Sequence, residues 1–249
     1  MNTIFFLLPF TFQATLVEAF LRANTAGKTL VVLLFIGSVV AWSIMVTKFV
    51  EYRRAARESQ RFLEHYRGES HPLSLIVKLQ SFPGCPLYMM YRAACRTLHG
   101  VLQERGLNPQ EFFSDRPDAA QLKLDYADIK IMRNIIDQTV DEQIIQLEKN
   151  VVVLATAVTA APFLGLLGTV WGVMDAFGGL AIQGTATLSA VAPGISGSLI
   201  ATLAGLIVAL PSLIGYNMLT SRIRILSAMM EHFAEELLAD FERSSLRSQ

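Results

Sequence analysis

Small and hydroxyl-bearing side chains recur at helical spacing in two long apolar segments of the chain. In the second segment, Ser198, Thr202 and Gly205 follow one another at steps of four and three residues, so they share one face of a helix. In the first segment, Thr169 lies on a similar narrow stripe of small residues. Hydroxyl groups both donate and accept hydrogen bonds, and they can line a path for water or ions. Small residues also allow two helices to pack closely, so the stripes alone leave both interpretations open.

Asp175 is the one charged residue between residues 151 and 220. A charged aspartate at the centre of a membrane helix costs about 2.5–3.5 kcal/mol on insertion scales. Asp175 precedes Gly178 and Gly179 near the predicted outer end of its segment, which favours a solvated interfacial carboxylate over a proton-handling acid. If the chain conducts protons, we therefore expect another polypeptide to supply the titratable group at membrane depth.

Other kinds of chemistry find little support in the sequence. The histidines are scattered without metal-ligand spacing, and Cys85 and Cys95 are interpreted as free structural thiols. No phosphate-binding loop of the GxxxxGK[ST] or GxGxxG type is present. The net charge is zero, which gives no reason to expect nucleic-acid binding. The sequence thus predicts a protein that is not an enzyme and has no cofactor or metal site.

Three apolar segments are long enough to cross a bilayer, which takes about 20 residues in a helix. We predict transmembrane helices over residues 29–48, 151–177 and 191–219. The first of these lies between Lys28 and Lys48, and the residues between the two lysines carry no charge. The predicted fold class is therefore all-α, a polytopic membrane protein whose three membrane helices extend into a helical cytoplasmic region.

Basic residues indicate which side of the membrane each connection occupies. Arg53, Arg54 and Arg57 follow the first predicted span. Arg222 and Arg224 follow the third, whereas the connection between the second and third spans has no lysine or arginine. By the positive-inside rule, the long loop after span one and the C-terminal tail are cytoplasmic, and the N-terminus is on the outer side. The basic residues could also bind anionic lipid headgroups.

The domain boundaries follow from these spans. Residues 1–28 are predicted to hold an outer-side interfacial helix, because apolar residues of Thr15–Arg22 can share one face. Residues 49–150 form the cytoplasmic helical region, residues 178–190 an outer-side loop, and residues 220–249 a cytoplasmic C-terminal helix.

Within the cytoplasmic region, breaks at proline and glycine separate three helical stretches. Residues 51–66 are predicted to continue the first membrane helix. A second helix is expected over Leu87–Arg105. The stretch Asp118–Asn150 contains neither glycine nor proline, and its apolar residues recur mostly at steps of three and four. We expect it to be an amphipathic helix that runs directly into the second span.

Two long motifs stand out in the apolar segments, APFLGLLGTVWGVMDAF (Ala161–Phe177) and VAPGISGSLIATLAGLIVALPSLIGYN (Val191–Asn217). Both resemble the TolQ/ExbB proteins and, more distantly, the flagellar stator protein MotA. The resemblance implies an inner-membrane proton-channel and stator subunit that forms a homopentamer around the membrane helices of an ExbD/TolR-type partner. The partner's single span would carry the titrating aspartate. Proton flow would then energise a TonB- or TolA-like protein that reaches across the periplasm.

The resemblance also implies which residues line the ion path, and this sequence differs from the family pattern at one position. The family's pore-lining threonines correspond to Thr169 and Thr202. Many members carry a glutamate in span three where this chain has Gly197, which lies between Ser196 and Ser198. The alternatives are a non-conducting membrane scaffold of such an assembly and a sodium-driven variant. The sequence does not separate a Tol system from a TonB system.

Overall fold

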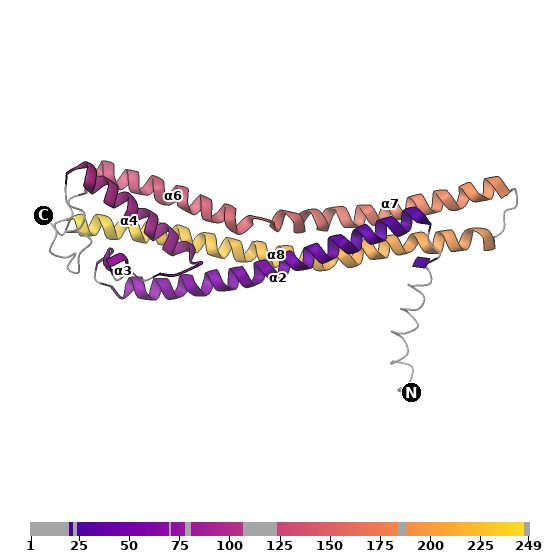
Figure 1. The fold of residues 1–249 in the computed structure, drawn as a ribbon, viewed down its shortest axis with the longest axis horizontal. Helices are drawn as coiled ribbons and strands as arrows, with labels where there is room; N and C mark the ends of the chain where they lie inside the picture. Colours follow the sequence, from indigo (N-terminus) through magenta and orange to yellow (C-terminus); the bar gives the residue numbers. More distant parts are fainter. Residues whose placement is uncertain are drawn as a thin grey trace, which may run out of the picture. The chain divides into compact units, whose positions relative to one another are not determined.

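The computed structural model describes residues 20–21, 24–69, 71–77, 81–106, 124–183 and 188–246. Within these residues the chain forms helices and no strand (Figure 1). The helices are α2 Thr25–Arg67, α3 Ser74–Val77, α4 Pro86–Glu104, α6 Tyr126–Glu148, α7 Val151–Gln183 and α8 Leu188–Leu246.

The three predicted membrane helices are confirmed as helices of sufficient length and apolar character. Helices α2, α7 and α8 each contain a stretch apolar enough to cross a bilayer, whereas α4 and α6 do not among the described residues. Helix α2 continues through Arg67, which confirms that residues 51–66 extend the first membrane helix. Helix α4 agrees with the helix expected over Leu87–Arg105 to within one residue at each end.

The chain divides into two compact units, which are described separately. The span unit comprises Met1–Thr47 and Asn150–Leu219, and the loop–tail unit comprises Lys48–Lys149 and Thr220–Gln249. Helices α2 and α8 contribute to both units, α4 and α6 belong to the loop–tail unit, and α7 belongs to the span unit.

The amphipathic helix predicted before the second span is present as α6, but it does not run directly into α7. Helix α6 ends at Glu148, and Asn150 adopts a left-handed backbone conformation with φ of 70° before α7 begins. Asparagine tolerates this conformation better than most residues and often ends helices. The amphipathic helix expected over Asp118–Asn150 therefore ends at Glu148, and a two-residue break separates it from α7.

Helices also extend into the segment that the sequence analysis assigned to an outer-side loop. Helix α7 continues through Gly178 and Gly179 to Gln183, and α8 begins at Leu188. Glycine inside a helix costs only about 1 kcal/mol relative to alanine, so two glycines in an apolar helix do not necessarily end it. Most of the predicted interfacial helix Thr15–Arg22 lies outside the described residues.

The core of the loop–tail unit is built around an aromatic cluster. Phe62 of α2 is fully buried, and its ring lies 5.4 Å from that of Phe233 of α8 and 5.7 Å from that of Tyr91 of α4, centroid to centroid. Aromatic pairs at this separation stabilise a core beyond their buried area. The cluster joins three helices of the unit.

Polar contacts at the helix ends fix α6 beside α4 (Figure 1). Asp125 caps α6 through a capping box, in which its backbone N–H donates to the Asp128 carboxylate at 2.8 Å. Asp128 is buried and also pairs with Arg105 at the end of α4 at 2.5 Å. A buried carboxylate needs such partners. The contacts among Asp125, Asp128 and Arg105 therefore hold α4 against α6.

Candidate ion-path site

Glycines allow α7 and α8 to approach each other closely in the span unit, where Figure 1 shows the two helices side by side. A Cβ added at Gly205 of α8 would lie 2.5 Å from the carbonyl oxygen of Ala161 of α7. A Cβ added at Gly165 of α7 would lie 2.8 Å from the carbonyl oxygen of Ala201 of α8. The stripes of small residues therefore pack the two helices backbone against backbone within one chain.

Thr169 and Thr202, the two predicted path-lining threonines, lie next to each other at the edge of this contact. The Thr202 hydroxyl donates to the carbonyl oxygen of Gly165 at 3.0 Å, and the two threonine Oγ1 atoms are 3.5 Å apart. The Thr169 hydroxyl donates to Leu166 O at 2.7 Å. Both threonine residues are half-buried in the single chain. Their oxygens retain lone pairs that could accept hydrogen bonds from water or coordinate a cation.

The remaining predicted stripe residues are buried, and Ser198 and Gly205 lie inside the helix contact. Ser198 is 3% exposed, and its hydroxyl donates to its own helix at Ile195 O, 2.8 Å away. A Cβ at Gly172 of α7 would collide with the Ser198 side chain. Gly197 and Gly205 are also buried. The structure thus brings Thr169 and Thr202 together at a partly accessible position, and it places Ser198, Gly197 and Gly205 where little solvent reaches them in the single chain.

Asp175 lies six residues after Thr169 on α7, a little less than two helical turns, and is exposed. Its carboxylate accepts a hydrogen bond from the side-chain amide of Asn24 at 3.1 Å. The Asn24 carbonyl oxygen of the same side chain accepts from Gly27 N–H at 2.8 Å and so caps α2. Asn24 therefore connects the start of α2 to α7. Asn24 carries no signal for this role in the sequence, because a contact across 151 residues has no local pattern.

Large apolar side chains cover the outward faces of the span unit. They include Phe163 at 71% exposed and Met174 at 62% on α7, and Leu199 and Leu210 at 59% each on α8. A soluble domain rarely exposes apolar side chains over so much of its surface. These faces suit contact with lipid or with another membrane helix.

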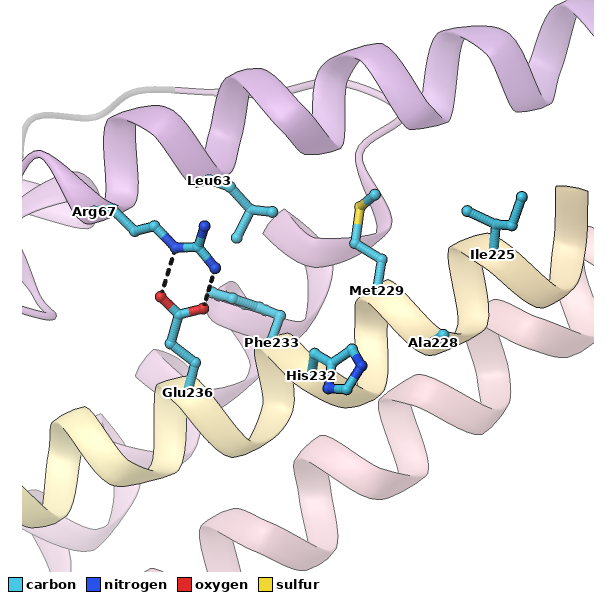
Figure 2. Close-up of a pocket in the computed structure, with 8 residues that line it drawn as sticks. All are labelled: Leu63, Arg67, Ile225, Ala228, Met229, His232, Phe233 and Glu236. Carbon is cyan, nitrogen blue, oxygen red and sulfur yellow. Dashed lines mark hydrogen bonds and ion pairs between the residues drawn. The ribbon is translucent and has the colours of Figure 1, made fainter.

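A shallow pocket lies in the loop–tail unit between α2 and α8, with a volume of about 340 Å³ (Figure 2). Its floor is mostly apolar and includes Leu63, Met229 and Phe233. At one end the Arg67 guanidinium faces the Glu236 carboxylate and donates two hydrogen bonds, each 2.8 Å long. These two charges satisfy each other across the pocket, and the arrangement does not indicate a reactive site.

The described residues hold no cluster of histidine, cysteine or acidic side chains that could bind a metal ion. Cys85 and Cys95 are buried free thiols, as the sequence analysis expected. Burial raises the pKa of the Cys95 thiol to about 12, so this thiol stays protonated and unreactive near neutral pH.

Comparison of the sequence with those of known proteins indicates one family. The sequence model of the MotA/TolQ/ExbB proton channel family matches residues 107–232. The chain is 28% identical to the Tol-Pal system protein TolQ of Haemophilus influenzae, over 94% of this chain and 97% of the relative. It is 29% identical to TolQ of Pseudomonas aeruginosa, over 89% and 90%. It is 28% identical to the biopolymer transport protein ExbB of Neisseria meningitidis serogroup A, over 83% and 87%.

Proposed function

The chain belongs to the MotA/TolQ/ExbB proton channel family, and from this membership we propose that it is the ion-channel and stator subunit of a Tol- or TonB-type energy-transduction system. With an ExbD/TolR-type partner it converts the proton motive force into mechanical work for envelope transport. It has no enzymatic activity in this role.

The observation that carries the proposal is the adjacent pair Thr169 and Thr202. Two threonine hydroxyls 3.5 Å apart lie at the partly accessible edge of the contact between two apolar membrane-length helices. Isolated hydroxyls in such helices usually bond only to their own backbone, whereas the Thr202 hydroxyl reaches across to the other helix. Oxygens at the edge of a helix pair can replace part of the hydration shell of an ion or hold a water.

The partner is required because the chain offers no acid at membrane depth. Asp175 is the one charge between residues 151 and 220, and it bonds to the side chain that caps the first turn of α2. A proton path through hydrocarbon needs a titratable group, which a single-span ExbD/TolR-like protein would supply as an aspartate. Five copies of this chain would surround the partner's helices, and the partner would act on a TonB- or TolA-like protein.

The proposed location is the bacterial inner membrane, with the N-terminus in the periplasm and the C-terminal tail in the cytoplasm. The distribution of arginines supports this orientation: Arg53 and Arg54 on α2 and Arg222 and Arg224 on α8 follow the apolar stretches. These exposed side chains suit contact with anionic lipid headgroups.

A second candidate function is a non-conducting scaffold of the same assembly. The burial of Ser198, Gly197 and Gly205 favours it, because three of the predicted path residues are shielded in the single chain. A sodium-driven channel is a third variant, since hydroxyl oxygens bind sodium as well as water. The two conducting variants and the scaffold make different predictions for Thr202.

Replacing Thr202 by valine is expected to lower partner-dependent ion uptake into liposomes at least about fivefold, the equivalent of one lost hydrogen bond of about 1 kcal/mol. Valine has the shape of threonine but no hydroxyl, so the α7–α8 contact should persist. The measurement is uptake under an imposed gradient of protons or, separately, of sodium. Thr202→Ser, which keeps the hydroxyl, is the matched control and should conduct nearly as well as the wild type.

Wild-type uptake by an assembled Thr202→Val protein would show that the hydroxyl serves only helix packing, and the scaffold would then be the better account. The ion whose gradient drives uptake in the wild type separates the proton-driven from the sodium-driven variant.

A further inference from the structure

Helices α2 and α8 form an open apolar groove in the loop–tail unit, at the pocket shown in Figure 2. Leu63 of α2 and Met229 of α8 are half-buried in it, and Ile225 of α8 is 53% exposed. An exposed apolar surface with polar residues at its rim often marks a site of protein contact. The charges on the two helices indicate what could occupy the groove.

Both walls of the groove carry exposed basic residues. On α2, Arg53, Arg57 and Arg61 recur every four residues and therefore share one face of the helix. On α8, Arg222 and Arg224 are exposed just before the residues that line the groove. An occupant with exposed carboxylates would complement these walls.

The outward face of α6 has the opposite charge. Asp137 and Asp141 lie one turn apart, Glu148 lies two turns further, and all three are exposed. Ile131 and Ile145 of the same helix are 47% and 65% exposed. At 100° per residue, these five residues fall within about 120° of the helix circumference. This acidic face with exposed isoleucines matches the groove in both charge and apolar character.

The acidic face of α6 points away from the core of its own unit. Met132 and Ile136 are fully buried on the opposite side of the helix. Between described residues, no ion pair involves Arg57, Asp137 or Asp141. A second copy of this chain could therefore bring its α6 to the groove. A contact between two different faces is heterologous and forms a ring where the rotation closes.

A contact within one chain shows which residues of α2 and α6 lie at the same height along the helices. In the loop–tail unit α6 runs antiparallel to α2 and to α8 (Figure 1). The Tyr52 hydroxyl of α2 donates to the carbonyl oxygen of Leu147 of α6. Counted from that contact, Arg57 lies five residues onward along α2 and Asp141 six residues back along α6, about 8 and 9 Å. Rotation about an axis along the helices therefore brings Arg57 of one copy level with Asp141 of the next.

A second contact gives the same result for α8. Arg133 of α6 and Glu235 of α8 form an ion pair of 2.8 Å. Counted from it, Asp137 lies four residues onward along α6, and His232 in the groove lies three residues back along α8, about 6 and 5 Å. The same rotation brings Asp137 of one copy level with His232 of the next. The acidic face thus lies at the height of the groove.

We propose that the outward face of α6 docks into the groove between α2 and α8 of a neighbouring copy of this chain. Asp141 then faces Arg57, Asp137 faces His232, and Ile145 contributes apolar contact. The interface deepens the proposed function and rests on it for the closed ring of copies around the partner. Each copy supplies the groove on one side and the α6 face on the other.

Cysteine cross-linking of the full chain, co-expressed with its partner and kept in membrane vesicles, tests the contact. One copy carries Arg57→Cys and an affinity tag, and a second copy carries Asp141→Cys and a different tag. A short bismaleimide should join them into a dimer with both tags, which no link within one chain can produce. Two copies that both carry Arg57→Cys should not be joined, because the interface is heterologous. The unsubstituted chain, whose described cysteines Cys85 and Cys95 are buried, gives the background.

Arg57→Cys combined with Glu104→Cys is the matched control. Glu104 is an exposed acid of the same unit, next to Arg105, which pairs with Asp128 of α6. Asp128 lies thirteen residues before Asp141, about 20 Å along the helix, so a short cross-linker should not span the difference. This pair should give the background only.

Charge reversal is tested on a second cross-linking pair, His232→Cys with Asp137→Cys. Arg57→Glu should lower the yield of this cross-link about fivefold, the upper end of what one exposed ion pair contributes to an equilibrium constant. Adding Asp141→Arg exchanges the two charges and should restore the yield. If Arg57→Glu prevents assembly, Arg57→Gln removes the charge alone and is judged by the same yield.

Background cross-linking between Arg57→Cys and Asp141→Cys in an assembled complex overturns the interface. So does a second cross-link that Arg57→Glu leaves unchanged or that Asp141→Arg does not restore. If Arg57→Glu instead lowers only the binding of the complex to phosphatidylglycerol vesicles, the arginine serves the lipid surface and the interface is again overturned. A wild-type complex that is cross-linked but takes up no ions contradicts the proposed function and leaves the interface standing.

Discussion

Replacing Gly205 by alanine is expected to disrupt the α7–α8 contact and with it the assembly of the span unit. The added Cβ would lie 2.5 Å from the carbonyl oxygen of Ala161 and 3.2 Å from the Cα of Gly165. Both are backbone atoms in the middle of a helix, so neither can move aside without moving the whole helix. Inserting atoms into a well-packed contact typically costs about 1–3 kcal/mol and can cost more where the backbone must shift.

The measurement is the yield and size of the detergent-extracted assembly, together with its thermal stability. Gly178→Ala is the matched control: Gly178 also lies in a membrane-length helix, but a Cβ there would meet nothing within 4 Å. Alanine is a better helix former than glycine, so the control should assemble as well as the wild type. A Gly205→Ala protein that assembles and melts like the wild type would contradict the backbone contact described for α7 and α8.

Phe62→Ala is expected to destabilise the loop–tail unit by about 3–5 kcal/mol, the usual cost of removing a buried aromatic ring. Phe62 is fully buried, and its ring is 5.4 Å from the rings of both Phe82 and Phe233. Its removal would leave a cavity among three helices that cannot collapse easily. The measurement is thermal unfolding of the purified protein, followed by circular dichroism.

Tyr126→Ala serves as the control for this prediction, because Tyr126 is 82% exposed at the start of α6. Its loss removes an aromatic ring without opening a cavity and should leave the unfolding temperature close to that of the wild type. Equal unfolding temperatures for Phe62→Ala and Tyr126→Ala would mean that the aromatic cluster does not form the core of this unit.

Most of the helices could be predicted from the sequence because their signals are local. The residues between Lys28 and Lys48 are uncharged and apolar over a bilayer-spanning length, and α2 follows from them. Helix α4 begins directly after Cys85, whose side chain accepts a hydrogen bond from the Tyr88 N–H and caps the helix. The end of α6 could not be predicted, because Asn150 lies in a stretch without glycine or proline and an asparagine does not by itself mark a left-handed backbone conformation.

Part of the candidate site could likewise be predicted from the sequence, and part of it could not. The proximity of Thr169 and Thr202 follows from helical periodicity on two helices that must pair, and the sequence motifs led to the same two residues. The shielding of Ser198 could not be predicted, because it depends on how closely Gly172 lets α7 approach. The hydrogen bond between Asn24 and Asp175 joins residues that are 151 positions apart in the sequence. The hydrogen bond from Lys48 to the carbonyl oxygen of Gln146 spans 98 positions. A periodic pattern of residue types contains no information about such distant pairs.

The proton path, with its titrating acid on another chain, is the central claim, and ion uptake by reconstituted liposomes tests it most directly. Three preparations are compared under the same imposed pH gradient: this chain alone, this chain with its ExbD/TolR-type partner, and this chain with a partner whose membrane aspartate is replaced by asparagine. We predict uptake in the second preparation only. Equal uptake by this chain alone, or by the complex with the asparagine partner, would contradict the claim.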